Sequence, residues 1–163
     1  MRYNKIRKMD IADGPGVRVS VFMQGCTFNC KQCFNPDTHD FNGGKEFTGD
    51  TINRILELAE NENIQGLSIL GGEPMHPKNI EGTTELAKAF KEKFPNKTVW
   101  SWTGFSFDKD LKDKEVSKYI DVLVDGQYVD ELRNPKLKYC GSSNQRVIDV
   151  QKSLKEDKIV LFD

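Results

Sequence analysis

The sequence predicts a single α/β domain over residues 1–163, folded as an open, partial (β/α) barrel around a mainly parallel sheet. Short apolar segments alternate with amphipathic ones, which is typical of βαβ units. Glycine-containing turns follow several of the apolar segments where each would end as a strand. The chain has 163 residues, whereas a closed eight-fold barrel typically needs about 250. We therefore expect the barrel to be incomplete.

Composition excludes several classes of protein. The net charge is −1, and the 30% of charged residues are mixed in sign, so we expect no nucleic-acid partner. Residues 1–8 lack the apolar core of a signal peptide. No apolar run approaches the roughly 20 residues of a membrane span, so we expect no membrane partner. The expected compartment is the reducing cytoplasm, where cysteines bind metals rather than form disulfides.

The first half of the chain predicts a turn, a strand, a loop and a helix. Residues 10–16 are rich in turn-forming residues, and in residues 17–23 valine or methionine occupies every second position, as expected for a strand. Residues 36–45 are mostly polar and are expected to form a loop. Residues 52–59 place their apolar side chains on one helical face, with Thr48 or Asp50 as the N-cap.

The second half predicts further βα units. Residues 67–70 and 98–102 are apolar enough for strands, and a helix containing residues 86–94 is closed by Pro95. Residues 105–115 are expected to form a charged connection before a fourth strand. The fourth strand, with the turn that follows it, spans residues 120–126. Three later segments show weaker strand patterns: 136–139, 146–150 and 159–162.

Three of the four cysteines lie in one short segment, Cys26, Cys30 and Cys33, with the pattern C-x3-C-x2-C. Thiolates are soft ligands that bind iron–sulfur clusters or zinc. A closed four-iron cluster needs four protein ligands, so three thiolates leave one iron open to a reactant. The alternatives are a structural zinc site with a distant fourth ligand such as Cys140, or ordinary buried thiols. We expect Cys140 to be a free thiol.

Four predicted strand ends carry the candidate site. The cysteine segment, residues 71–74, Thr103-Gly104 and Asp125-Gly126 each follow a predicted strand. The carboxyl ends of parallel strands meet at one edge, where active sites of such folds lie. Asp125 could therefore bind a ligand or an ion. The two histidines, His39 and His76, are expected to be exposed loop residues.

The cysteine pattern resembles the signature of radical S-adenosylmethionine (SAM) enzymes. This resemblance implies a radical SAM type of partial barrel and one [4Fe-4S] cluster per chain, held by the catalytic Cys26, Cys30 and Cys33. SAM would chelate the open iron, and an electron would cleave it to methionine and a 5′-deoxyadenosyl radical. The Gly-Gly-Glu motif of the family, whose backbone holds the methionine amino group, resembles Gly71, Gly72 and Glu73.

The adenine side of the expected SAM site is less regular. Many radical SAM enzymes have an aromatic residue just before the third cysteine, but this chain has Gln32 there. The resemblance therefore implies that the ring of Phe34, or the backbone of residues 32–34, contacts the adenine.

Several segments together resemble the activating enzymes of class III anaerobic ribonucleotide reductases. The chain departs from them at Gln32, where glycine is common, and at Cys140, where arginine is expected. The resembling segments run in family order: 13–18, 25–35, 71–77, 102–105, 122–126 and 141–146.

This narrower resemblance implies a reaction and its partners. The radical would abstract hydrogen from a glycine on the large subunit of the anaerobic reductase, and a flavodoxin-type donor would supply the electron. The alternatives are an activase of another glycyl-radical enzyme, or a small radical SAM enzyme acting on a metabolite, such as a 7-carboxy-7-deazaguanine synthase. Outside enzymes, a zinc-stabilised binding module or an electron carrier remains open.

Overall fold

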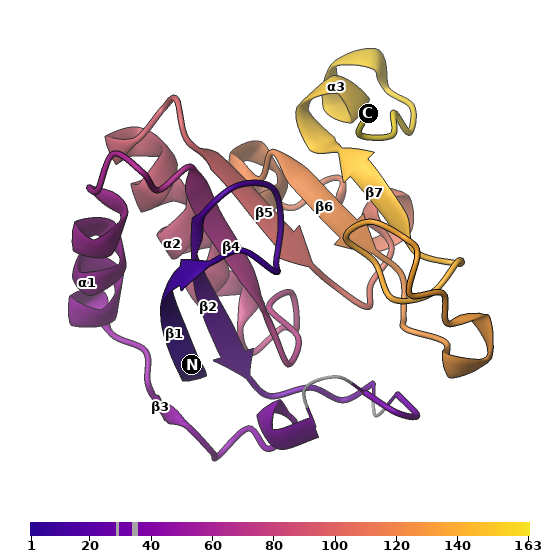
Figure 1. Ribbon diagram of the computed structural model, residues 1–163, viewed down its shortest axis with the longest axis horizontal. Coiled ribbons are helices and arrows are strands. Elements are labelled where there is room, and N and C mark those ends of the chain that lie inside the picture. The colour runs from indigo at the N-terminus through magenta and orange to yellow at the C-terminus, as the bar shows by residue number, and fades with distance from the viewer. Residues whose placement is uncertain (29, 34–35) are drawn as a thin grey trace.

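The computed structural model describes residues 1–28, 30–33 and 36–163. A seven-stranded open sheet runs through the molecule in the order β3-β1-β2-β4-β5-β6-β7 (Figure 1). The strands are β1 (Arg2–Asp10), β2 (Arg18–Gln24), β3 (Lys45–Glu46), β4 (Gly66–Gly71), β5 (Thr98–Trp102), β6 (Val122–Asp125) and β7 (Arg146–Asp149).

The sheet is mixed rather than uniformly parallel. The four central strands β2, β4, β5 and β6 are parallel to one another. On one side β1 pairs antiparallel with both β2 and β3, and on the other side β7 pairs antiparallel with β6. The predicted α/β class and open sheet are confirmed, and the parallel arrangement holds for the four central strands. Sequence patterns do not predict β1, because most of its residues are charged or polar and only Asp10 is buried.

The described helices are α1 (Gly49–Ala59), which precedes β4, α2 (Ile80–Lys93), which connects β4 to β5, and α3 (Val150–Glu156), which follows β7. The short helical turns are η1 (Pro36–Thr38), η2 (Phe107–Leu111), η3 (Glu115–Tyr119) and η4 (Asp130–Leu132). As predicted, Thr48 is the N-cap of α1, and its backbone N–H donates to the Thr51 hydroxyl at 3.0 Å. None of the helices in the described ranges is long and apolar enough to span a bilayer.

The predicted charged connection over 105–115 joins β5 to β6 and contains a π-helical turn, η2, followed by the 3₁₀ turn η3. The three weaker strand predictions need correction. Residues 136–139 form turns rather than a strand. Residues 159–162 contribute a single bridge, between Leu161 and Ile148, and the strand predicted over 146–150 ends at Asp149 because α3 begins at Val150.

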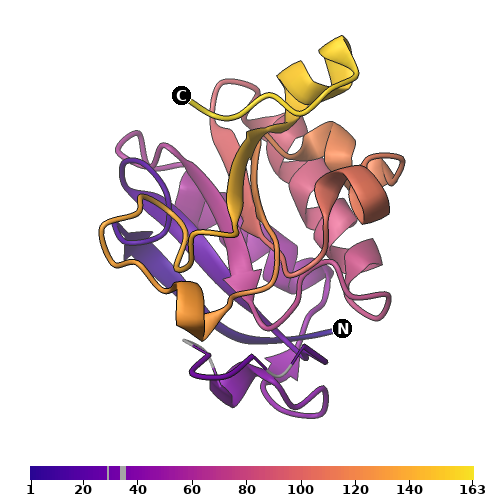
Figure 2. The same cartoon turned by 90° about the vertical axis from the view of Figure 1, so that its right-hand side faces the viewer.

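The two faces of the sheet have different coverings. Alternate side chains of each strand, such as Val21, Ile69 and Leu123, are buried beneath the helices in the main core. The intervening side chains, including Phe22 and Trp102, point to the opposite face. Figure 2 shows α2 and the short helical turns on one side of the sheet, and the loops formed by residues 11–17 and 126–145 on the other. The candidate site lies on this loop-covered face.

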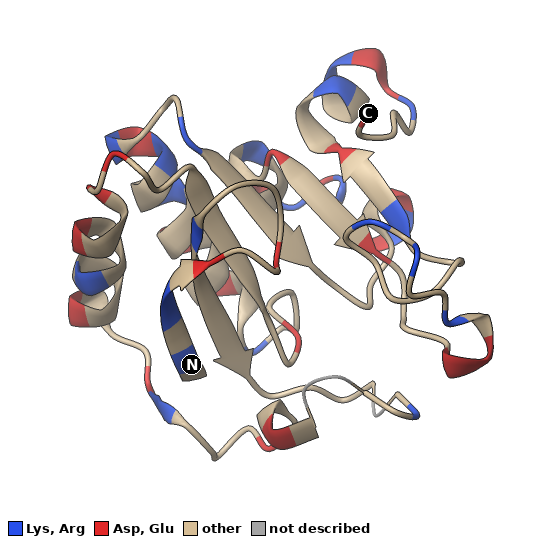
Figure 3. Ribbon diagram, in the orientation of Figure 1, with Lys and Arg blue, Asp and Glu red and all other residues tan. Residues whose placement is uncertain are grey.

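Charged residues of both signs are interspersed along α1, α2 and α3 (Figure 3). This distribution matches the balanced composition of 24 basic and 25 acidic residues. It is typical of a solvated surface that offers no large field of one sign.

Arg18 is a buried cation that joins three strands to the loop of residues 11–17. Its side chain is 1% exposed, and burial lowers its pKa to about 10. The guanidinium donates to the Ser68 hydroxyl at 2.8 Å, and to the backbone oxygen of Thr98 at 2.9 Å. It also donates to the backbone oxygens of Leu67 and Pro15. Arg18, part of the family-like segment 13–18, therefore satisfies buried carbonyl groups rather than a carboxylate partner.

Replacement of Arg18 by leucine should destabilise the fold. The change would leave several buried oxygen atoms without a donor, and each such group costs about 1–3 kcal/mol. We expect Arg18→Leu to lower the free energy of unfolding by roughly 3 kcal/mol in urea denaturation. Arg54→Leu, an exposed change on α1, is the matched control and should stay within about 0.5 kcal/mol of wild type. Equal effects of the two changes would contradict this role of Arg18.

Candidate functional site

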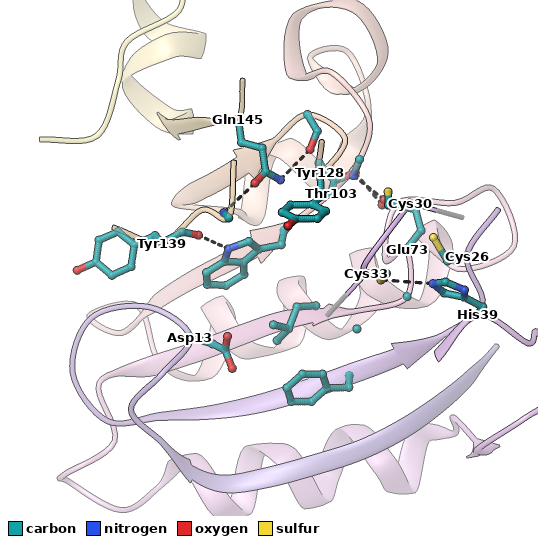
Figure 4. Close-up of a pocket in the computed structure, with 18 of the residues that line it drawn as sticks. Asp13, Cys26, Cys30, Cys33, His39, Glu73, Thr103, Tyr128, Tyr139 and Gln145 are labelled. Carbon is teal, nitrogen blue, oxygen red and sulfur yellow. Dashed lines mark hydrogen bonds between the residues drawn. The ribbon is translucent and has the colours of Figure 1, made fainter. Parts of the chain in front are cut away.

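The three clustered cysteines face a common cavity. Cys26, Cys30 and Cys33 follow β2 and line a cavity of about 370 Å³ (Figure 4), which is in the size range of small-molecule sites. Two backbone hydrogen bonds join the ends of this loop. The N–H of Gly25 donates to the oxygen of Thr38 at 2.6 Å, and that of Cys26 donates to the oxygen of His39 at 3.1 Å.

The donor set fits a cluster with one open iron. Three thiols on one loop, lining one cavity, match the soft ligands that iron–sulfur clusters require. Within the described ranges, no three Cys, His, Asp or Glu side chains converge as they would on a single ion. Thiolates that each ligate a separate iron of a cluster need not meet at one point.

The turn of Gly71, Gly72 and Glu73 forms the adjoining wall of the cavity. The N–H of Gly72 donates to Met23 O at 2.9 Å, and that of Glu73 donates to Gly25 O at 2.7 Å. Gly71 has φ +110°, and a Cβ on Gly72 would lie 2.5 Å from Gly25 O. Glycine is therefore required for the turn to pack against the cysteine loop, and it leaves the cavity wall here as bare backbone.

The Glu73 carboxylate is buried and links two strand ends. It accepts from the Thr103 hydroxyl at 2.7 Å, from the Gly104 N–H at 2.6 Å and from the Met75 N–H at 2.9 Å. Burial raises the pKa of Glu73 to about 7, and the three hydrogen bonds oppose this rise. The side chain thus holds the turn after β4 against the loop after β5.

All four predicted strand ends contribute to the cavity. Thr103 and Gly104 follow β5, and Gly126 follows β6. Asp125 itself is not among the described lining residues. Its buried carboxylate accepts from the Phe107 N–H at 2.8 Å and forms an ion pair with Arg146 at 2.6 Å. The Asp125 side chain therefore joins β6 to β7 and η2.

The expected adenine side is only partly described. Gln32 is exposed, lies outside the described lining of the cavity and has φ 57°. This left-handed conformation favours glycine, the residue common at that position in the resembled family. Phe34 lies outside the described residues.

Residues on the loops complete the cavity at the end opposite the cysteines. Tyr139 and Asp13 lie there in Figure 4. The Trp102 indole N–H donates to Tyr139 O at 2.6 Å, and the Gln145 side chain bridges Gly141 N and Gly126 O at 2.9 Å each. Burial and the neighbouring Asp10 raise the pKa of Asp13 to about 7. Sequence reasoning did not assign Asp13 to the site, because its segment reads equally well as a turn.

His39 is less exposed than expected, whereas Cys140 is a free cysteine as expected. His39 is half-buried in the cavity wall, with Nε2 3.4 Å from Cys33 Sγ. Cys140 lines a neighbouring cavity of about 290 Å³ beside Tyr139, and burial raises the pKa of its thiol. No spacing pattern in the sequence signals the contact of His39, since its position depends on how the loop closes.

The raised pKa of Glu73 predicts a pH dependence of stability. The folded protein binds the proton more tightly than the unfolded chain, so stability should fall as pH rises from about 4.5 to about 7. The contribution of Glu73 is up to about 3 kcal/mol. Urea denaturation at several pH values across this range should show that the free energy of unfolding falls less steeply with pH in Glu73→Gln than in the wild type. Asp13, whose pKa is also raised, should account for the pH dependence that remains.

Glu57→Gln, an exposed change on α1, is the control for this titration and should keep the wild-type slope. An unchanged slope in Glu73→Gln would show that the carboxyl group is not protonated preferentially in the folded state.

Comparison with known proteins places this geometry in a family. A family model described as a 4Fe-4S single cluster domain matches residues 12–148. An anaerobic ribonucleoside-triphosphate reductase-activating protein of Enterobacteria phage T4 is 40% identical over 147 residues, covering 90% of this chain and 93% of its own. Proteins of the same name from Vibrio cholerae and Escherichia coli K12 are 36% and 37% identical, covering 89% and 90% of this chain and 96% and 97% of theirs. The chain therefore belongs to the family of anaerobic ribonucleoside-triphosphate reductase-activating proteins.

Proposed function

We propose that this protein activates anaerobic ribonucleoside-triphosphate reductase by generating a glycyl radical on its large subunit, through reductive cleavage of SAM at a [4Fe-4S] cluster. The observation that carries the proposal is the position of three thiols beside the bare backbone of Gly71 and Gly72 in one cavity. Cys140, the fourth cysteine, lines a different cavity. The relatives' names supply the reductase as the partner.

Each part of the site has a role in this proposal. Cys26, Cys30 and Cys33 would hold the cluster through their thiolates, and the iron without a protein ligand would remain open to SAM. The backbone of Gly71–Glu73 binds the amino group of SAM through its carbonyl oxygens, since a protonated amino group can only donate hydrogen bonds. When bound, the cluster would supply the electron for cleavage of SAM, and the resulting radical would abstract hydrogen from the glycine. The segment of residues 32–34 borders the adenine.

The fold suits a macromolecular substrate. In the proposal, the open sheet acts as a single-domain, incomplete barrel of the radical SAM type, and a glycine-bearing loop of the reductase enters between the loops on the face that the helices leave free. Loops formed by residues 11–17 and 126–145 flank the cavity on that side. A flavodoxin-type protein supplies the electron, and the reaction takes place in the reducing cytoplasm, where thiolates are available as ligands.

The proposed function predicts a specific radical. The protein is reconstituted anaerobically with iron and sulfide, reduced, and mixed with SAM and the cognate reductase. Electron paramagnetic resonance should then show a glycyl radical on the reductase, and 5′-deoxyadenosine should accumulate. Omitting SAM or the reductase provides the controls. Formation of 5′-deoxyadenosine with a metabolite, but no radical on the reductase, would contradict the proposal.

Ligand assignment is tested by a pair of cysteine variants. Cys30→Ala should lose a cluster ligand and reduce SAM cleavage to background, because the remaining two thiolates cannot hold the cluster with one open iron. Cys140→Ala should retain at least about half of the wild-type rate, as expected of a change outside the reacting groups. Iron content and 5′-deoxyadenosine yield are the measurements. Equal loss in both variants would show that the ligands are wrongly assigned.

A further inference from the structure

His39 contacts one of the three thiols directly. Its Nε2 lies 3.4 Å from Cys33 Sγ, and the side chain lines the cavity together with the cysteines (Figure 4). Nitrogen–sulfur hydrogen bonds are longer than those between nitrogen and oxygen, because sulfur is the larger atom, and this separation is consistent with one. The two residues are six positions apart in the sequence, so the contact joins the cysteine segment to the part of the chain that follows η1.

The backbone of His39 is held from both sides. Gln24, whose side chain is 2% exposed, donates from its amide to Asp37 O at 3.0 Å and to Asp40 O at 2.8 Å. These two carbonyls bracket His39. The carbonyl of His39 also accepts from the Cys26 N–H at 3.1 Å. These hydrogen bonds fix the backbone that carries the imidazole next to the end of β2. They reduce the entropy cost of holding the ring against the sulfur.

The chemistry of the site dictates the direction of this hydrogen bond. A cysteine that ligates iron is a thiolate and can only accept, so Nε2 must carry the proton and donate it to Cys33 Sγ. A hydrogen bond to a ligating sulfur stabilises the state of the cluster that carries more negative charge. That state is the reduced one, because reduction adds one electron. Donation from His39 therefore favours reduction.

We infer that His39 is a positioning residue that donates a hydrogen bond to Cys33 and raises the reduction potential of the cluster, easing its one-electron reduction by an external low-potential donor. The inference rests on the cluster site of the proposed function. It assigns to His39 a role that the spacing of the cysteines does not predict.

The test is a redox titration of anaerobically reconstituted variants. The signal of the reduced cluster is followed by electron paramagnetic resonance, and iron and sulfide are counted in each sample. His39→Leu should bind the cluster in full, but its equilibrium constant for one-electron reduction should be lower by a factor between roughly two and ten. This is the contribution of one hydrogen bond. A tenfold change corresponds to about 59 mV towards more negative potential.

Two further variants make the result specific. His39→Gln places an amide N–H near the position of Nε2 and should restore most of the wild-type potential. His76→Leu removes the other histidine, which packs on Phe41, and should leave the potential unchanged. A wild-type potential in a fully loaded His39→Leu protein would overturn the inference.

Assembly of the cluster gives the remaining outcomes. Should His39→Leu lose the cluster, a loaded His39→Gln protein with wild-type potential would support the hydrogen bond, whereas loss of the cluster in both would assign His39 a structural role and overturn the inference. Absence of iron from the wild-type protein would instead reject the proposed function, so the two failures are distinguishable.

Discussion

The junction between the cysteine loop and the Gly-Gly-Glu turn determines the geometry of the site. The Glu73 N–H donates to Gly25 O, while the Glu73 carboxylate binds Thr103 and Gly104 at the next strand end. One residue thereby connects loops from β2, β4 and β5. Because Gly72 has no side chain, the first two loops pack backbone to backbone, and the three thiols face a wall of peptide groups.

The rest of the fold supports this junction by separating two kinds of surface. One face of the sheet buries aliphatic side chains against the helices. The other carries Phe22, Leu70 and Trp102 into the cavity beneath the loops. Arg18 satisfies backbone carbonyls of adjacent strands on this second face, so these polar groups are paired where helices do not cover the sheet. An open sheet can in this way present a preorganised site next to an accessible side.

The sequence was sufficient to predict features that depend on local patterns. Alternating apolar residues predicted β2, and Thr48 marked the start of α1. The turns after four strands could be placed together because parallel strands share a carboxyl edge. Contacts that depend on side-chain direction could not be predicted. Asp125 stands at a strand end, but its carboxylate pairs with Arg146. His39 contacts Cys33 across a loop whose backbone is bonded on both sides of His39 by the Gln24 amide. Likewise, β1 is too polar to stand out and forms through pairing with β2.

The central claim is that three thiolates leave one iron open for SAM. Electron–nuclear double resonance on the reduced, reconstituted protein, with SAM labelled by ¹⁵N at its amino group and ¹⁷O at its carboxylate, tests it most directly. The account predicts couplings from both labels, because both groups bind the iron that lacks a protein ligand. Absence of both couplings from a fully loaded cluster would contradict it, since the fourth iron would then be closed to the cofactor.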